Sequence, residues 1–88
     1  MITKEFIIPN TLGLHVRASN KLVECACKFI SDVKMIFNDE QIDCKRILQV
    51  MSSGAKMGDK IAIVVTGNDA NQAITALSEL IESGFGES

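Results

Sequence analysis

The residues of this chain best suited to chemistry are His15 and Arg17, within Gly13-Leu14-His15-Val16-Arg17. His15 is the only histidine among the 88 residues. Imidazole titrates near neutral pH, so a useful fraction of it is neutral and nucleophilic. The segment immediately precedes an expected helix, whose free backbone N–H groups and partial positive charge favour an anion. A nucleophilic nitrogen, a nearby cation and free N–H donors are three parts of a site that accepts and holds a phosphoryl group.

A simpler interpretation of the same segment is that His15 is a surface residue or a helix cap. Taken alone, a single histidine near a helix end is more often one of these than a functional group. The rest of the chain must therefore decide between the two interpretations.

The composition is that of an ordinary globular protein, with 47% hydrophobic and 23% charged residues. Its length predicts one domain over residues 1–88. The formal net charge is −2 and the basic residues are scattered, which argues against a nucleic acid and favours a protein partner. No segment approaches the roughly 18 consecutive apolar residues of a membrane span. The N-terminus lacks the features of a secretory signal, so we expect a cytoplasmic protein that does not insert into membranes.

The chain has three cysteines, Cys25, Cys27 and Cys44, an odd number that cannot pair completely within one chain. Cys25 and Cys27 would point about 200° apart on a helix, which makes them a poor chelating pair. We expect small, buried, reduced thiols and no metal site.

Apolar periodicity predicts alternating strands and helices. Strands are expected over residues 2–8, 33–37, around 41–43 and over 60–66, and helices over 16–28, 45–53 and from about 70 to 83. Asp69 and Gln72 resemble a capping box at the start of the last helix. Gly54 and Gly84 are placed to end the second and third helices. Residues 85–88 are expected to form a short mobile tail.

The predicted order, βαββαβα, favours an α+β fold, an open-faced β-sandwich. It would have a small antiparallel four-stranded sheet with three helices on one face. A ferredoxin-like βαββαβ arrangement is the nearest alternative.

The segment 45–55, Lys-Arg-Ile-Leu-Gln-Val-Met-Ser-Ser-Gly-Ala, is the second informative motif. Ile47, Leu48 and Met51 recur at helical spacing, and Val50 falls to one side of them. On so short a helix some of these side chains should remain exposed, which would suit a protein-contact surface. Simple core packing explains the same pattern about equally well.

Together, Gly-Leu-His-Val-Arg and the 45–55 motif resemble the histidine-containing phosphocarrier (HPr) family of the bacterial phosphoenolpyruvate-dependent phosphotransferase system. The resemblance extends over the whole chain: its length, its element order, the separation of the two motifs and the ending Leu-x-Glu-Leu-Ile-Glu-Ser-Gly-Phe. It implies an HPr-like fold and a phosphocarrier of sugar transport.

In this family, the histidine matching His15 receives a phosphoryl group on Nδ1 from phosphorylated enzyme I. It passes the group to an enzyme II component, here expected to be an A-type protein. The resemblance thus implies a carrier with a covalent phosphohistidine rather than a turnover enzyme, with no metal and no organic cofactor. Arg17 could bind the phosphoryl oxygens through charge-assisted hydrogen bonds, and the backbone N–H groups of Val16 and Arg17 would add donors.

The resemblance also implies a docking surface and an oligomeric state. Partners would dock around His15 on Val16, Asn20, Ile47, Leu48 and Met51. Such complexes should be small and transient, and a monomer is the family expectation.

The chain departs from the family pattern at several positions. Ala18 replaces a proline that most members have, which should loosen the first helical turn without loss of function. Arg46 stands where many members carry a regulatory phosphoserine, so regulation by a serine kinase at that position is not available. Glu24, Cys27 and Gln49 replace residues that are often basic in sugar-system members, which leaves the partner set open.

Three functions remain possible: a carrier for sugar uptake, a carrier in the nitrogen-related regulatory branch, and a non-catalytic docking module with the same fold. The ending Glu82-Ser83-Gly84-Phe85 and the absent regulatory serine favour the nitrogen branch without deciding it. Because a pure docking module needs neither His15 nor Arg17, their presence argues for a carrier.

Overall fold

The computed structural model describes residues 1–87, which form four strands and three helices in the predicted order. The elements are β1 (Ile2–Ile7), α1 (Val16–Cys27), β2 (Asp32–Phe37), β3 (Glu40–Asp43), α2 (Ile47–Ser52), β4 (Lys60–Thr66) and α3 (Ala70–Glu82). The largest difference from the prediction is that α2 begins at Ile47 instead of Lys45. The Asp43 carboxylate accepts a hydrogen bond from the Lys45 N–H, and Arg46 is extended, so the chain turns here before the helix begins.

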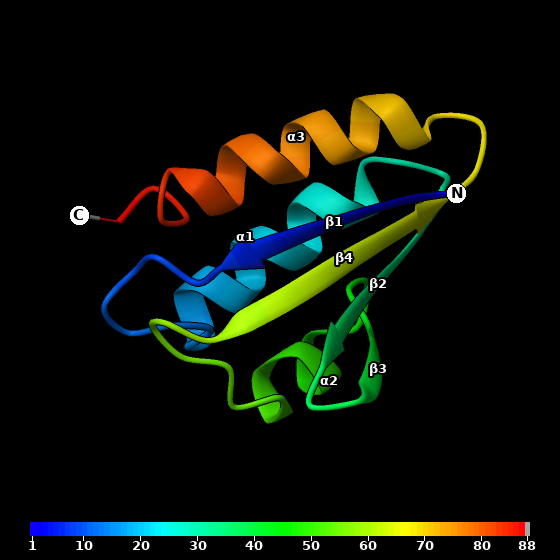
Figure 1. Ribbon diagram of the computed structural model, residues 1–88. Coiled ribbons are helices and arrows are strands. Elements are labelled where there is room, and N and C mark those ends of the chain that lie inside the picture. The colour runs from blue at the N-terminus through cyan, green and yellow to red at the C-terminus, as the bar shows by residue number, and fades with distance from the viewer. Residues whose placement is uncertain (88) are drawn as a thin grey trace.

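The four strands form one antiparallel sheet in the order β1-β4-β2-β3 (Figure 1). Alternate residues of β4 point to opposite faces, and Ile61, Ile63 and Val65 are buried while Lys60 and Thr66 are exposed. One face is therefore packed and the other is open, which confirms the predicted open-faced α+β sandwich.

The helices cover the packed face (Figure 1), and their apolar stripes are buried. On α1 the stripe includes Ala18, Leu22 and Ala26, and on α3 it includes Ala73, Leu77 and Ile81, all buried against the sheet. Burying each large aliphatic side chain stabilises the fold by roughly 1.5–3 kcal/mol. None of the helices within residues 1–87 is long and apolar enough to cross a membrane.

The predicted capping box at Asp69 is wrong. Asp69 is the N-cap residue of α3, but its side chain caps no backbone group of that helix. Its carboxylate instead accepts hydrogen bonds from the N–H groups of Ile30 and Ser31 and from the Ser31 hydroxyl. The Ser31 hydroxyl, followed by the two N–H groups, lowers the pKa of Asp69. Asp69 thus fastens the loop after α1 to the start of α3, a long-range contact that its sequence neighbours do not indicate.

The predicted mobile tail is also wrong for residues 85–87; Ser88 lies outside the described residues. Gly84 adopts φ +70° directly after α3, as predicted for a helix stop. The N–H of Phe85 donates to the Leu80 carbonyl (2.9 Å) and the N–H of Gly84 donates to the Ile81 carbonyl (3.0 Å). This pair of bonds is a Schellman motif, which reverses the chain after a helix. It turns the Phe85 side chain into the core, where it is completely buried.

Candidate functional site

His15 is positioned by a loop between β1 and α1 that lies against the segment after α2. The N–H of Leu14 donates to the Ala55 carbonyl at 3.0 Å. Gly13 has φ +63°, and a Cβ there would lie 2.5 Å from the Lys56 Cα. Glycine is therefore required for this close approach, which fixes the backbone just before His15.

The start of α1 leaves backbone donors beside His15. His15 is the N-cap residue, its carbonyl accepts the Ser19 N–H at 2.8 Å, and its side chain makes no capping hydrogen bond. The buried Ser19 hydroxyl donates to the Leu14 carbonyl at 3.0 Å, which anchors the first turn. The N–H groups of Val16 and Arg17 belong to this first turn and have no intrahelical acceptor.

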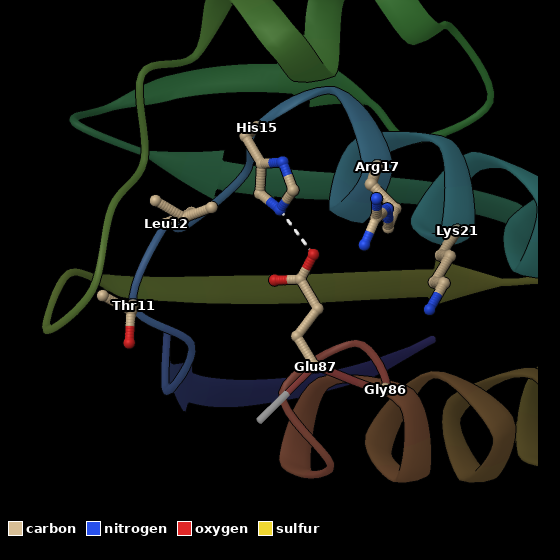
Figure 2. Close-up of a pocket in the computed structure, with 7 residues that line it drawn as sticks. All are labelled: Thr11, Leu12, His15, Arg17, Lys21, Gly86 and Glu87. Atoms are coloured by element: carbon tan, nitrogen blue, oxygen red, sulfur yellow. Dashed lines mark hydrogen bonds and ion pairs between the residues drawn. The ribbon is translucent and has the colours of Figure 1, made fainter.

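The imidazole of His15 contacts a carboxylate from the other end of the chain. Its Nε2 lies 2.6 Å from Oε2 of Glu87, 72 positions later. The side chains of His15 and Glu87 are 27% and 15% exposed. Figure 2 shows Nδ1 on the side of the ring away from Glu87, toward the first turn of α1. The nitrogen that is not bonded to Glu87 therefore faces the helix start.

Glu87 is itself held by Asn10, which is buried. The Asn10 Nδ2 donates to the Gly13 carbonyl at 2.8 Å and to Oε1 of Glu87 at 3.0 Å. The hydrogen bond from Asn10 is the largest cause that lowers the pKa of Glu87, followed by the bond to His15 and the positive charges of His15 and Arg17. Glu87 is therefore held ionised next to the imidazole.

Two basic side chains of α1 complete the site. Lys21 Nζ donates to the Phe85 carbonyl at 2.8 Å, which helps to hold residues 85–87, called the chain end below, against α1. Arg17 is exposed, and its side chain makes no hydrogen bond or ion pair within residues 1–87, so it is available to an incoming group. The pocket that contains these groups is shown in Figure 2 and is lined by Thr11, Leu12, His15, Arg17, Lys21, Gly86 and Glu87.

An apolar patch, defined here as Val16, Leu48 and Met51, is exposed on α1 and α2, which are in contact. Leu48 is the most exposed of the three, at 75%. Val50, on the other side of α2, is completely buried. Simple core packing thus explains Val50 but not the exposed residues. Of the remaining predicted docking residues, Ile47 is half-buried beside the patch and Asn20 is exposed on α1.

The sequence interpretation missed three residues of the site, Asn10, Lys21 and Glu87. The sequence pattern assigns no functional role to Asn10 or Lys21, and it places Glu87 in a mobile tail. The pair Gly84-Phe85 is the signal that could have placed Glu87, because a glycine followed by an apolar residue after a helix is typical of a Schellman motif.

The cysteines lie away from this site and differ in exposure. Cys25 and Cys44 are buried as predicted, but Cys27 is exposed, contrary to the prediction. Its position on α1, opposite the buried stripe, explains the difference. Burial raises the pKa of Cys25 and raises that of Cys44 to about 12. No group of three or more potential metal-ligating side chains was found within residues 1–87.

Known proteins resemble the chain over almost its whole length. Residues 2–83 match the family described as "PTS HPr component phosphorylation site". The phosphocarrier protein HPr of Cupriavidus necator is 42% identical over 87 residues, covering 99% of this chain and 98% of the relative. The crystal structure of HPr-C-His from Thermoanaerobacter tengcongensis has a TM-score of 0.96 at 35% identity, covering 100% of this chain and 99% of that one. The histidine-containing phosphocarrier protein of Mycoplasma has a TM-score of 0.89 at 36% identity, covering 96% and 97%. The sequence resemblance is confirmed, and the chain belongs to the PTS-HPr family.

Proposed function

We propose that this chain is a phosphoryl carrier of the phosphotransferase system in which Nδ1 of His15 is the accepting atom. It receives the group from phosphorylated enzyme I and passes it to an enzyme II component. The observation that carries the proposal is the placement of the imidazole. Its Nε2 is hydrogen-bonded to Glu87, while its Nδ1 lies toward the free N–H groups at the start of α1 (Figure 2).

The transfer requires little covalent work from the protein. The lone pair of Nδ1 forms a bond to phosphorus while the bond from phosphorus to the donor breaks, and that electron pair stays on the donor. The N–H groups of Val16 and Arg17, with the Arg17 guanidinium, bind the phosphoryl oxygens. In the onward step the acceptor forms the new bond and the N–P electron pair returns to His15.

The site stabilises the phosphoryl group only moderately, as a carrier requires. Arg17 is exposed, so water competes for its hydrogen bonds. A deeply buried, fully enclosed phosphoryl group would be held too tightly to reach a second protein. The open position at a loop next to a helix start lets donor and acceptor approach the same nitrogen in turn.

Partners dock on the apolar patch and its neighbours. Val16, Leu48 and Met51 supply exposed apolar area beside His15, with Ile47 and Asn20 at its margin. Arg46, whose side chain is 71% exposed, adds positive charge that favours an acidic partner surface. A patch of three exposed apolar side chains suits small, transient complexes.

We further propose five finer points, which rest on the family resemblance and on the length and composition of the chain. The acceptor is an A-type enzyme II protein, the carrier acts as a monomer, and it works in the cytoplasm. It functions as one domain over residues 1–88 and needs no metal or organic cofactor.

Intact-mass spectrometry after incubation with enzyme I and phosphoenolpyruvate tests the proposal. We expect a gain of one acid-labile phosphoryl group in the wild type and none in His15→Ala. Circular dichroism should show that the variant is folded, because the His15 side chain is not part of the core. An enzyme I preparation active on its own carrier is the positive control. A wild type that gains no phosphoryl group, or a His15→Ala variant that gains one, would refute the proposal.

A further inference from the structure

We infer that Glu87 is a positioning residue for phosphoryl transfer: its carboxylate accepts the Nε2–H of His15 and so presents the Nδ1 lone pair to the phosphoryl group. This inference rests on the proposed function, because it assigns a role in that same transfer. It concerns a residue at the far end of the chain that the fold brings to within 2.6 Å of the imidazole.

The orientation of the Asn10 amide is fixed by its two acceptors. One hydrogen of its Nδ2 is donated to the Gly13 carbonyl and the other to Oε1 of Glu87. If the amide were flipped, its Oδ1 would face the Gly13 carbonyl oxygen and the Glu87 carboxylate, which are acceptors only. The amide is therefore fixed with Nδ2 toward Glu87.

The orientation of the carboxylate fixes the proton on the imidazole. An ionised carboxylate only accepts hydrogen bonds, so Oε2 of Glu87 can bond to Nε2 of His15 only if that nitrogen carries a hydrogen. In a neutral imidazole the other nitrogen then has the lone pair. Because Nε2 is 2.6 Å from Oε2, the neutral ring keeps its hydrogen there and its lone pair on Nδ1.

The carboxylate also offsets the charge that develops during transfer. As Nδ1 bonds to phosphorus, the ring becomes more positive and its Nε2–H becomes a stronger donor. A hydrogen-bonded carboxylate of this kind orients a histidine ring and determines which of its nitrogens carries the hydrogen. Among the described residues that line the pocket with the ring, the charged ones are Arg17 and Lys21 from α1 and Glu87 after α3, and Glu87 is the negative one of the three.

The attachment of the chain end makes this contact durable. Phe85 is completely buried two positions before Glu87, and its carbonyl accepts a hydrogen bond from Lys21 Nζ. The N–H of Glu87 donates to the Gly84 carbonyl at 3.0 Å. Glu87 is therefore placed by the core and by backbone bonds, and its carboxylate does not depend on His15 alone for its position.

Glu87→Gln is the most informative variant, since it is isosteric yet reverses one hydrogen bond. Asn10 still presents Nδ2, so the new amide oxygen turns to Asn10 and the new NH₂ group turns to His15. That NH₂ group donates to Nε2, which moves the ring hydrogen to Nδ1 and removes the nucleophilic lone pair. In Glu87→Ala no side chain fixes the ring hydrogen on either Nδ1 or Nε2, and the ring is solvated.

The rate constant for phosphoryl acceptance from phosphorylated enzyme I, measured in a single turnover, should therefore follow an unusual order. We expect wild type to be fastest, Glu87→Ala about threefold slower and Glu87→Gln about tenfold slower, because the hydrogen bond from Gln holds the ring in the form without a lone pair on Nδ1. Nitrogen-15 NMR of the neutral imidazole should place the hydrogen on Nε2 in the wild type and mainly on Nδ1 in Glu87→Gln.

Glu82→Gln is the matched control, because Glu82 belongs to the last turn of α3 and its carboxylate lies 3.7 Å from Lys4 Nζ. It should accept phosphoryl groups at the wild-type rate. A purely structural role for Glu87 would make the isosteric Gln milder than Ala, and that order would overturn the inference. So would a wild-type rate or an Nε2–H ring in Glu87→Gln. Failure of the proposed function can be distinguished from failure of this inference, because in the first case the wild type itself accepts no phosphoryl group.

Discussion

The two regions beside His15 are built in opposite ways. The imidazole itself is half-buried and bonded to Glu87, which is bonded to Asn10, so two segments far apart in the sequence, the loop after β1 and the segment after α3, fix one side chain. The apolar patch of Val16, Leu48 and Met51 is instead exposed, and its residues lie at the surface of two contacting helices. The first region is polar and held by directional hydrogen bonds. The second is apolar, and its side chains have no polar group that could form such bonds.

In the proposed function, this difference separates the transfer chemistry from the docking of partners. In-line transfer needs a nitrogen whose position and proton are fixed, and hydrogen bonds supply both. Serial docking on a donor and an acceptor needs a surface without strict geometry, and exposed aliphatic and methionine side chains supply it. Changes around the imidazole should therefore alter the transfer rate, and changes in the patch should alter partner affinity.

The largest effect is expected for Phe85→Ala, which removes the anchor of the chain end from the core. Truncating a buried Phe costs about 3–5 kcal/mol of unfolding free energy. The folded fraction should also lose the Glu87 contact and accept phosphoryl groups at the slower rate expected for Glu87→Ala. Urea unfolding and single-turnover transfer measure the two effects.

Phe37→Ala is the matched control for that prediction, because Phe37 ends β2 and is only partly buried. It should cost less stability and leave the transfer rate of the folded protein unchanged. Equal transfer rates in the Phe85 and Phe37 variants would show that the chain end does not support the imidazole.

Arg17→Ala should slow phosphoryl acceptance about tenfold, since a charge-assisted hydrogen bond to the phosphoryl oxygens is lost. The affinity for enzyme I should change much less, because Arg17 is not part of the apolar patch. Rapid-quench transfer and isothermal titration calorimetry separate the rate from the affinity. Unchanged transfer kinetics would remove Arg17 from the mechanism.

Leu48→Gln should affect affinity and not the transfer rate. We expect it to weaken binding to enzyme I by about 1 kcal/mol, or about fivefold. The transfer rate at saturating enzyme I should stay near that of the wild type. Ile30→Gln is the matched control, because Ile30 is 79% exposed but follows the far end of α1. If both variants bind enzyme I as the wild type does, α2 is not at the interface.

The smallest effect is a pH dependence of stability from Glu87. Its pKa is lowered in the folded protein from an ordinary value of 4.5, so its ionised form favours folding. This contribution is complete above about pH 4.5 and is lost as the pH falls through the lower folded value. The melting temperature of the wild type should therefore exceed that of Glu87→Ala at neutral pH, and the two should converge in acid. A difference that grows in acid would contradict this assignment.

The sequence was sufficient for the fold because its signals are local. Alternation in 60–66 and the apolar stripes of the two long helices predicted β4, α1 and α3 closely. The errors at Asp69 and at residues 85–87 have different causes. The partners of Asp69 are Ile30 and Ser31, far along the chain, and periodicity contains no information about such pairs. Residues 85–87 are held by a Schellman motif and by the buried Phe85, whose local signal is the pair Gly84-Phe85 and not an apolar period.

The site was predicted to a similar extent. His15 and Arg17 were placed at a helix start by local pattern, and the structure brings Val16 and the residues of α2 near them. The bond from His15 to Glu87 spans 72 positions and could not be read from either end. The sequence therefore predicted His15 as the group that we propose to react, and the folded chain indicates which of its two nitrogens is not bonded to Glu87.

The most direct test of this account is NMR of the phosphorylated protein labelled with nitrogen-15. The account predicts that phosphorus is coupled to Nδ1 of His15 and that Nε2 retains its hydrogen. A phosphorus coupling to Nε2, or a phosphoryl group on any other side chain, would contradict it.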